Sequence, residues 1–223
     1  MAQNLKIEGI YDQRTLKLLK SKGIRDFGFN FSPMSFNFIQ EHVFLKELVP
    51  LLEPKDKIHL HFSRINDPMI QKVILDLGKA GVGKENIFID CDEGTEKSQE
   101  IGVNYYLNYY PELTLAACAS PYFCGMIFNF SFFEDLHRRG ILNNFIANFY
   151  THFKQHLTED KQIVMRIDWN DNVFPSLFDY FDIDLMSFSI NDKIEVCYRN
   201  VDLKKLTVEM EHIEKNKNLT DNF

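Results

Sequence analysis

Eight short apolar runs follow one another along the chain, and patterns typical of helices separate most of them. Strands that alternate with helices pair in parallel through right-handed crossovers. Eight such units in 223 residues fit a single (β/α)₈ barrel, the TIM-barrel fold, at the small end of its usual range of about 200–400 residues. A doubly wound open sheet is the alternative. The runs are "LKIEG" (5–9), "DFGFNF" (26–31), "KIHLHF" (57–62), "NIFID" (86–90), "VNYYLNY" (103–109), "GMIFNF" (125–130), "QIVMRID" (162–168) and "DIDLMSFSI" (182–190).

The helices between these runs carry recognisable start and stop signals. One pattern begins after Asp12, a suitable N-cap, and ends at Gly23. A second has Asp67 before Pro68 at its first turn. A long pattern near the middle is expected to break at Gly140. This long pattern covers 131–157, and the remaining helices are predicted at 93–102, 112–120, 170–181 and 202–217, the first two of them short.

Composition and charge narrow the class of protein. Hydrophobic residues make up 45% and charged residues 26% of the chain, which is ordinary for a globular protein with a large core. No linker rich in Pro, Gly or Ser divides the chain, so we expect one domain over 1–215 and a polar tail over 216–223. The net charge of −7 argues against a nucleic acid or an anionic membrane as partner. We found neither a signal peptide nor a stretch of about 18 apolar residues and expect a cytoplasmic protein.

Two patterns that could indicate cofactor chemistry are rejected. The four cysteines form no C-x-x-C pair, so neither a zinc site nor a disulfide framework is expected. "GKAGVGKE" (78–85) has the G-x-x-x-x-G-K spacing of a phosphate-binding loop. That loop needs Ser or Thr after the lysine, a strand before it and a helix after it. Here Glu85 follows Lys84 and the order of the elements is inverted, so we interpret the segment as a helix end with a glycine turn into the next strand. We expect no metal and no cofactor.

Both ends of the chain resemble the phosphoribosylanthranilate isomerase family, a (β/α)₈ barrel of tryptophan biosynthesis. "KIEGI" (6–10) and "GFNFSPMSFNFI" (28–39) are similar to that family's K-I-C-G-I-T and G-F-x-F-x-P-x-S-x-R-x-I. "RIDWNDNVFPSLFDYFDIDLMSFSIN" (166–191) resembles its G-G-L-x-P-x-N-V and V-D-V-S-S-G-V-E. The likeness covers strands one, two, seven and eight, and the middle of the chain follows only the order of elements. The matching positions are Phe29, Phe31, Pro33, Ser35, Ile39, Asn172, Val173, Asp184 and Ser187.

The resemblance implies an Amadori isomerisation of an aminoaldose phosphate, with an acid and a base facing each other across the barrel mouth. In the family a Cys ending strand one is the base, an Asp ending strand six is the acid, and an Arg after strand two holds the anthranilate carboxylate. Glycine turns after strands seven and eight bind the phosphate. This chain has Glu8, Asn129 and Asn37 at the first three positions, and Ile167-Asp168 and Ser187-Phe188 at the two turns. We therefore expect that the ancestral substrate is not bound in the ancestral manner.

Polar residues at the predicted carboxyl ends of the strands are the candidate ligand-binding residues. Glu8 could act as a base, but an ion pair with Arg166 or Arg64 is the favoured interpretation. Arg166 and Asp168 share a face of their strand and favour a structural ion pair with each other. The candidate catalytic positions are Glu8 and Asn129, and the candidate substrate-binding residues are Asn37, His61, Arg64, Asp90, Arg166, Asp168, Ser187 and Ser189.

Histidines on strand three raise the question of a metal. His59 and His61 lie two residues apart and so on one face of the strand, and Asp90 or Asp92 on the next strand could complete a site. The favoured interpretation is that one histidine packs within the sheet and the other lines the mouth, with no metal.

These observations favour a divergent barrel that binds or acts on a small polar ligand at its mouth, with a sugar phosphate among the candidates. One alternative is an active phosphoribosylanthranilate isomerase that uses Glu8 as general base, with Asp90 or Asp168 as the acid. A second alternative is a non-catalytic interaction scaffold. The sequence does not define the oligomeric state.

Overall fold

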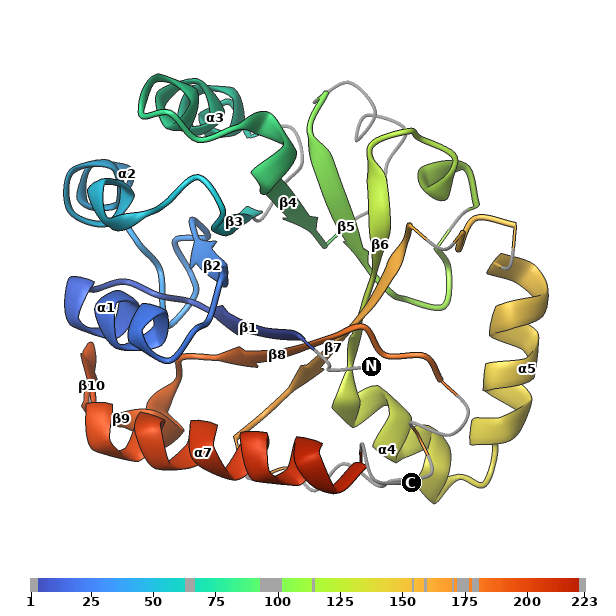
Figure 1. Ribbon diagram of the computed structural model, residues 1–223. Helices are drawn as coiled ribbons and strands as arrows, with labels where there is room; N and C mark the ends of the chain where they lie inside the picture. The colour runs from blue at the N-terminus through green and yellow to red at the C-terminus, as the bar shows by residue number, and fades with distance from the viewer. Residues whose placement is uncertain are drawn as a thin grey trace.

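The computed structural model describes residues 4–62, 67–92, 102–113, 115–153, 155–158, 160–169, 171, 177 and 181–220. Its eight main strands are parallel and close into a barrel in the order β1 to β8 (Figure 1). Strand β8 pairs with β1, with Leu5 beside Met186 and Glu8 beside Ser189. This confirms the single (β/α)₈ barrel and rules out the open sheet. The strands are β1 (Asn4–Glu8), β2 (Asp26–Asn30), β3 (Lys57–Phe62), β4 (Ile87–Cys91), β5 (Asn104–Asn108), β6 (Phe123–Asn129), β7 (Gln162–Ile167) and β8 (Leu185–Ser189).

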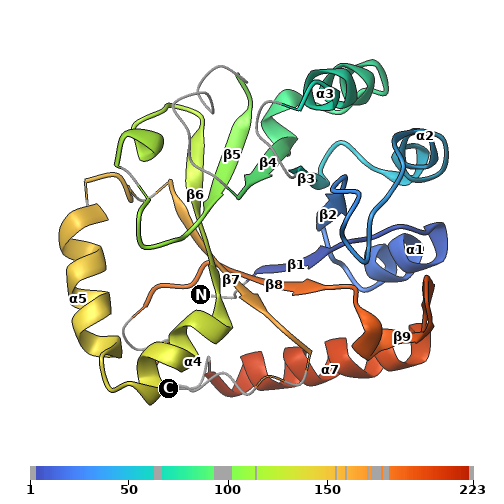
Figure 2. The ribbon, with the colours of Figure 1, turned by 180° about the vertical axis from the view of Figure 1, so that it is seen from behind.

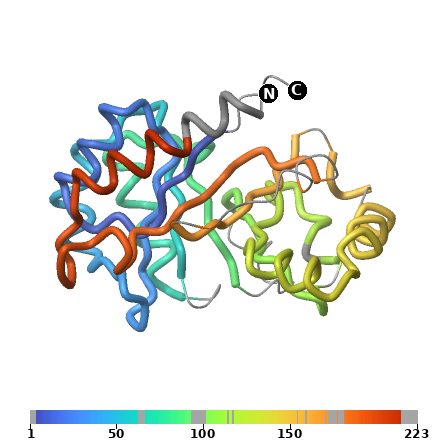
Figure 3. The backbone as a smooth tube through the Cα atoms, turned by 90° about the horizontal axis from the view of Figure 1, so that it is seen from below, coloured from blue at the N-terminus to red at the C-terminus, as the bar shows by residue number. Residues whose placement is uncertain are grey.

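Helices surround the barrel on its outside (Figures 1 and 2). Seen from below, α1, α2 and α7 lie to one side of the molecule and α4 and α5 to the other (Figure 3). No helix in the described part of the chain is long and apolar enough to cross a membrane. The α-helices are α1 (Gln13–Ser21), α2 (Glu41–Val43), α3 (Met69–Lys79), α4 (Phe130–Arg138), α5 (Leu142–Phe153) and α7 (Leu203–Thr220).

The predicted helix boundaries have clear physical causes. The Asp12 carboxylate accepts hydrogen bonds from the backbone N–H groups of Arg14 (2.9 Å) and Thr15 (3.0 Å), which confirms it as the N-cap of α1. The predicted break in the long middle helix is confirmed at Gly140, whose φ of 69° separates α4 from α5. The stretch 78–85 is the end of α3 followed by a turn into a 3₁₀ helix (Lys84–Asn86) and β4, as predicted.

Other elements differ from the expectation. The segment between β2 and β3, for which no helix was predicted, forms α2, a π-helical segment (Phe44–Leu48) and a 3₁₀ helix (Val49–Leu51). A 3₁₀ helix (Asp192–Ile194) and a small hairpin, β9 (Glu195–Cys197) with β10 (Asn200–Val201), follow β8 and were not predicted either.

The structure describes the remaining predicted segments only in part. The region 112–120 contains a 3₁₀ helix (Leu115–Cys118), and α7 reaches Thr220, so the first part of the predicted polar tail is helical. The predicted helices at 93–102 and 170–181 lie mostly outside the described residues.

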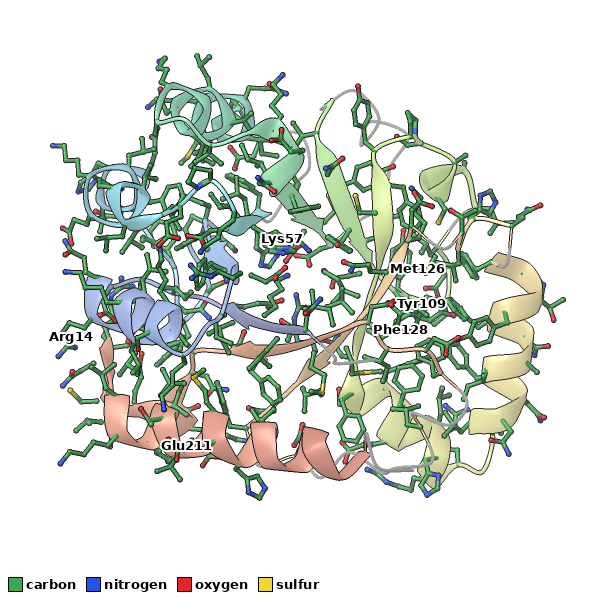
Figure 4. All side chains as sticks on the ribbon, viewed as in Figure 1. Arg14, Lys57, Tyr109, Met126, Phe128 and Glu211 are labelled. Carbon is green, nitrogen blue, oxygen red and sulfur yellow. The ribbon has the colours of Figure 1, made fainter. Side chains whose placement is uncertain are left out.

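The abundant phenylalanines fill the layer between the barrel wall and helices α4 and α5. Tyr109, just after β5, lies among the rings of this layer together with Phe128 of β6 (Figure 4). The Tyr109 ring stacks on Phe128 with centroids 4.7 Å apart and lies 5.5 Å from Phe145 and 5.9 Å from Phe149. Burying each such ring contributes about 1.5–3 kcal/mol. The rings are therefore core and do not form a ligand cage.

The barrel interior is divided into an apolar and a charged half. TIM barrels are usually filled by layers of Val, Ile and Leu. Here the apolar half is a separate cluster of inward-facing residues from β4 to β8. The charged half comes mainly from β1 to β4 and includes Lys6, Asp26, His59 and Asp90, all buried. The apolar cluster consists of Phe88, Tyr106, Ile127, Val164 and Leu185.

Candidate functional site at the barrel mouth

A small pocket opens at the carboxyl ends of the strands on the charged half of the barrel. Its free volume is about 20 Å³, which is room for one or two water-sized groups. Strands β1 to β4, the end of β8 and the segment after β2 contribute its walls. The lining residues are Glu8, Gly9, Gly28, Phe29, Asn30, Asn37, His59, His61, Asp90 and Ser189.

Glu8, at the end of β1, is held by three side chains. Arg166 Nε donates to Glu8 Oε2 at 2.9 Å, and Arg166 Nη2 donates to Oε1 at 3.3 Å. Ser187 Oγ donates to Oε1 at 2.7 Å, and Lys6 Nζ lies 3.0 Å from the same oxygen. Burial raises the pKa of Glu8, but Arg166 and Lys6 outweigh it and hold the pKa at about 2. The predicted ion pair with Arg166 is thus confirmed, and Arg64 lies outside the described residues.

Gly28 on β2 makes room for this carboxylate. A Cβ atom built on Gly28 would lie 2.8 Å from Cα and 3.0 Å from Cγ of Glu8. Any larger residue would displace the end of β1. The absence of a side chain at residue 28 therefore leaves the space that the end of β1 and Glu8 occupy.

Lys6 is the charged residue beneath Glu8 that was not among the predicted site residues. It is 0% exposed, and its Nζ lies 2.6 Å from Asp90 Oδ2 as well as 3.0 Å from Glu8 Oε1. Burial lowers the pKa of Lys6, but Asp90 and Glu8 outweigh it and raise the pKa above the ordinary value. Lys6 is therefore an ammonium and not a nucleophile. The alternation in "LKIE" already placed it on the same face of the strand as Glu8.

His59 lies deeper in the barrel between two carboxylates. Its Nε2 is 3.4 Å from Asp26 Oδ1, and its Nδ1 is 3.4 Å from Asp90 Oδ1. The imidazole stacks on Phe88 with centroids 5.0 Å apart. Burial raises the pKa of Asp90, but Lys6 and His59 outweigh this effect and lower the pKa, so this carboxyl stays ionised. Among the described residues no group of three or more His, Cys, Asp or Glu side chains is arranged to hold a metal ion.

His61 and Arg166 are joined across the rim by Asp92, which was considered only as a metal ligand, and by Asn108, which was not predicted. His61 Nε2 lies 2.9 Å from Asp92 Oδ2, and Asn108 Nδ2 donates to Asp92 Oδ1 at 2.7 Å. Arg166 Nη1 in turn donates to Asn108 Oδ1 at 3.3 Å. Burial lowers the pKa of His61, but Asp92 outweighs it and raises the pKa. Arg166 thus donates hydrogen bonds both to Glu8 and to Asn108 at the rim.

Asn37, which the sequence resemblance aligns with the family's arginine, is 8% exposed and ties two loops together. Its Nδ2 donates to the backbone oxygen of Ile190 at 3.0 Å, and its Oδ1 accepts from Asn30 Nδ2 at 2.9 Å. It packs directly on Gly9, where a Cβ atom would lie only 1.8 Å from Asn37 Nδ2. Asn129, which the sequence resemblance aligns with the family's acid, is exposed at the end of β6 and immediately precedes α4.

The turns after β7 and β8 bind their own side chains. Asp168 N–H donates to Asp171 Oδ2 at 3.0 Å, and Trp169 N–H donates to Asp168 Oδ1 at 2.8 Å. Asn191 Nδ2 also donates to Asp168 Oδ1, at 2.9 Å, and Asn191 Oδ1 accepts from Lys193 N–H at 3.1 Å. These backbone donors therefore already have acceptors.

Asp168 has a different ion-pair partner from the one predicted. Lys193 Nζ lies 2.7 Å from Asp168 Oδ2, whereas Arg166 pairs with Glu8. Burial raises the pKa of Asp168, but Lys193 and Asn191 outweigh it and lower the pKa. The predicted ion pair between Arg166 and Asp168 was therefore wrong, because Arg166 pairs with Glu8 of β1 and Asp168 pairs with Lys193 in the 3₁₀ helix after β8.

The end of β8 is covered by Trp169, which is 1% exposed. Trp169 Nε1 donates to the backbone oxygen of Ser189 at 2.5 Å, and its ring packs on Phe188 with ring centroids 5.0 Å apart.

Of the predicted site residues, Glu8, His61, Asp90, Arg166 and Ser187 form one connected network. Asp168 belongs to a second, separate cluster with Lys193, whereas Asn37 and Ser189 line the pocket.

No family model matches the chain, and no curated protein matches it. Among solved structures, phosphoribosyl anthranilate isomerase from Thermotoga maritima is 13% identical, with a TM-score of 0.60 over 96% of this chain and 99% of that one. The enzyme from Thermus thermophilus is 14% identical, with a TM-score of 0.58 over 96% and 99%. The Pyrococcus furiosus enzyme is 9% identical, with a TM-score of 0.54 over 94% and 99%.

This chain has the fold of phosphoribosylanthranilate isomerase. The matches extend over almost all of both chains, so the likeness first noticed at strands one, two, seven and eight holds for the middle of the barrel as well. At these identities the likeness concerns the fold, and the chemistry has to be argued from the residues at the mouth.

Proposed function

We propose that this chain is a divergent phosphoribosylanthranilate isomerase-like barrel that does not catalyse the Amadori isomerisation and instead binds or acts on another small polar ligand at its mouth. The proposal rests above all on the state of Glu8. A general base works best when its pKa is near the operating pH, and the pKa of Glu8 is held at about 2 by Arg166 and Lys6. Both carboxylate oxygens also already accept hydrogen bonds.

The candidate residues for the acid that the isomerisation needs also cannot donate a proton at neutral pH. Asn129 carries an amide, which cannot release a proton at neutral pH. Asp90 and Asp168 are the alternative acids, but the pKa of each is lowered by the cation beside it, Lys6 for Asp90 and Lys193 for Asp168. Both carboxyls are ionised at neutral pH and have no proton to donate.

The turns after β7 and β8, which bind the phosphate in the isomerase family, favour the same conclusion. A phosphate would need backbone N–H groups such as those of Asp168, Trp169 and Lys193, and these donate to the chain's own side chains. The carboxylates of Asp168 and Asp171 would also repel a phosphate at this place.

The test is turnover of phosphoribosylanthranilate by the purified protein, together with rescue of a strain that lacks the isomerase. We expect no turnover above background at high protein concentration and no rescue. Turnover that Glu8→Gln abolishes would replace our proposal with the active isomerase that uses Glu8 as base. A screen of small polar compounds by thermal shift separates the ligand-binding barrel from the non-catalytic scaffold, which would bind none of them at the mouth. We place the protein in the cytoplasm, with neither nucleic acid nor membrane as partner.

A further inference from the structure

Four exposed apolar side chains gather on the mouth side of the barrel. Two of them come from the segment after β2 and two from the β9–β10 hairpin, and the rings of Phe36 and Tyr198 meet edge-on with centroids 5.5 Å apart. The other exposed large apolar side chains in the described part of the chain are scattered over α3, α7 and the residue before β6. The four form what we call the apolar patch: Met34 (95% exposed), Phe36 (41%), Val196 (67%) and Tyr198 (68%).

Arg199 joins the two segments that carry the apolar patch. Its Nη1 donates to the backbone oxygen of Phe38 at 2.6 Å, and its Cζ lies 4.5 Å from the centroid of the Tyr11 ring. Its φ of 59° is a left-handed conformation that is uncommon for a residue with a side chain, and its N–H donates to Glu195 Oε2 at 3.0 Å. The chain itself therefore holds the patch in place, and a partner would not have to order it on binding.

The charges of the hairpin indicate what kind of surface fits the apolar patch. Glu195 accepts hydrogen bonds from the Tyr11 hydroxyl and from the Arg199 N–H, and the Arg199 guanidinium binds the segment after β2. Both charged side chains of the hairpin are thus engaged within the chain, so the complementary surface is apolar and uncharged. The same patch on a second copy of the chain has this chemistry, and a two-fold axis brings a surface onto itself.

The area of the apolar patch fits such a pairing. At roughly 150–200 Å² for a fully exposed side chain of this size, the four side chains leave roughly 400–500 Å² accessible on each copy. Two copies would therefore cover roughly 800–1,000 Å², and a standard interface of about 1,600 Å² contains about 900 Å² of non-polar area. Strand β9 has only β10 beside it in the described sheet, so its other edge adds backbone donors and acceptors next to the patch.

We propose that the apolar patch is an interface between two copies of this chain, related by a two-fold axis beside the β9–β10 hairpin. Each copy covers the Phe36, Val196 and Tyr198 side chains of the other. Asn37 follows Phe36 and lines the mouth pocket, so the second copy lies at the rim of that pocket. The inference goes beyond the proposed function and does not depend on it, because the residues of the patch lie outside the pocket lining.

Sedimentation equilibrium of the purified protein, from low micromolar to millimolar concentration, tests the pairing. We expect the mass to rise from 26.3 kDa for the single chain to twice that value. Val196→Ser should weaken the dimer at least tenfold, because the substitution lies at the centre of the interface and is present twice. Val208→Ser is the matched control, since Val208 is 63% exposed on α7 and lies outside the patch, and it should leave the dissociation constant unchanged.

Cys197 gives a second readout of the same interface. It is an exposed free thiol and lies between Val196 and Tyr198 in the hairpin. A short bismaleimide should link two copies through Cys197, and Cys197→Ser should abolish the link. Val196→Ser should reduce the yield of linked dimer, whereas Val208→Ser should leave it unchanged. Thermal melts followed by circular dichroism verify that each variant is folded.

Two results would overturn the inference. The first is a mass that stays at 26.3 kDa up to millimolar concentration, which would mean that a second copy does not cover the apolar patch. The second is a dimer whose dissociation constant is unchanged by both Val196→Ser and Tyr198→Ser, which would place the interface on another face. Failure of the proposed function would instead be seen as turnover of phosphoribosylanthranilate, which sedimentation does not measure.

Discussion

The carboxylate of Glu8 should stabilise the fold strongly at neutral pH and lose this effect in acid. Its pKa falls from 4.5 to about 2 on folding because Arg166 and Lys6 face it in a mostly buried position. At about 1.4 kcal/mol for each tenfold change, this corresponds to roughly 3 kcal/mol. A group whose pKa is lowered by folding contributes its full stabilisation above the unfolded value. That contribution is then lost as the pH falls from about 4.5 toward 2.

Glu8→Gln should therefore lower the free energy of unfolding by about 3 kcal/mol at pH 7, which is about 6–12 °C in Tm for a chain of this size. Urea unfolding of both proteins, followed by circular dichroism at pH 7, 5, 4 and 3, measures the difference. We expect it to shrink steadily below pH 4.5. Glu53→Gln is the control, since Glu53 also pairs with cations but at the surface, where solvent screens the pair and the change should be much smaller. A difference between wild type and Glu8→Gln that stays constant from pH 7 to pH 3 would refute the reasoning.

Three further predictions test the surroundings of Glu8 and the turn after β7. Lys6→Met should cost about 3–5 kcal/mol in urea unfolding, because Asp90 keeps its charge in the barrel without its ammonium partner. Gly28→Ala should cost about 1–3 kcal/mol by forcing the end of β1 aside, and a thermal melt no lower than that of the wild type would contradict this. Asp168→Ala removes a carboxylate and frees a backbone donor, so inorganic phosphate should raise the Tm of the variant and leave that of the wild type unchanged.

The barrel could be predicted from the sequence because each strand is short, apolar and followed by a turn or helix signal. The ends of α1 and the break at Gly140 follow from local chemistry, a capping carboxylate in one case and a positive φ in the other. The segment 41–51 was missed because it combines one short α-helical turn with π and 3₁₀ turns around Pro50, and such a mixture carries no regular period. The β9–β10 hairpin has too few residues to show an alternating pattern.

The ion pairs that the charged side chains form in and around the barrel could be predicted only in part. The pair of Glu8 with Arg166 was favoured because both residues were expected at strand ends on the same rim. The contact of Lys6 with Asp90 joins residues 84 positions apart and depends on how far each inward side chain reaches along the barrel axis. Lys193 was not considered as a partner of Asp168 because it lies in a turn after β8 whose course is set by tertiary contacts.

The central claim is that the mouth no longer performs the isomerisation, and direct turnover of phosphoribosylanthranilate tests it most simply. The change in anthranilate fluorescence with protein at high concentration would be compared between the wild type, Glu8→Gln and a control without protein. Our account predicts the same background rate in all three. A wild-type rate well above background that Glu8→Gln removes would contradict it, because Glu8 would then be a working base despite Arg166 and Lys6.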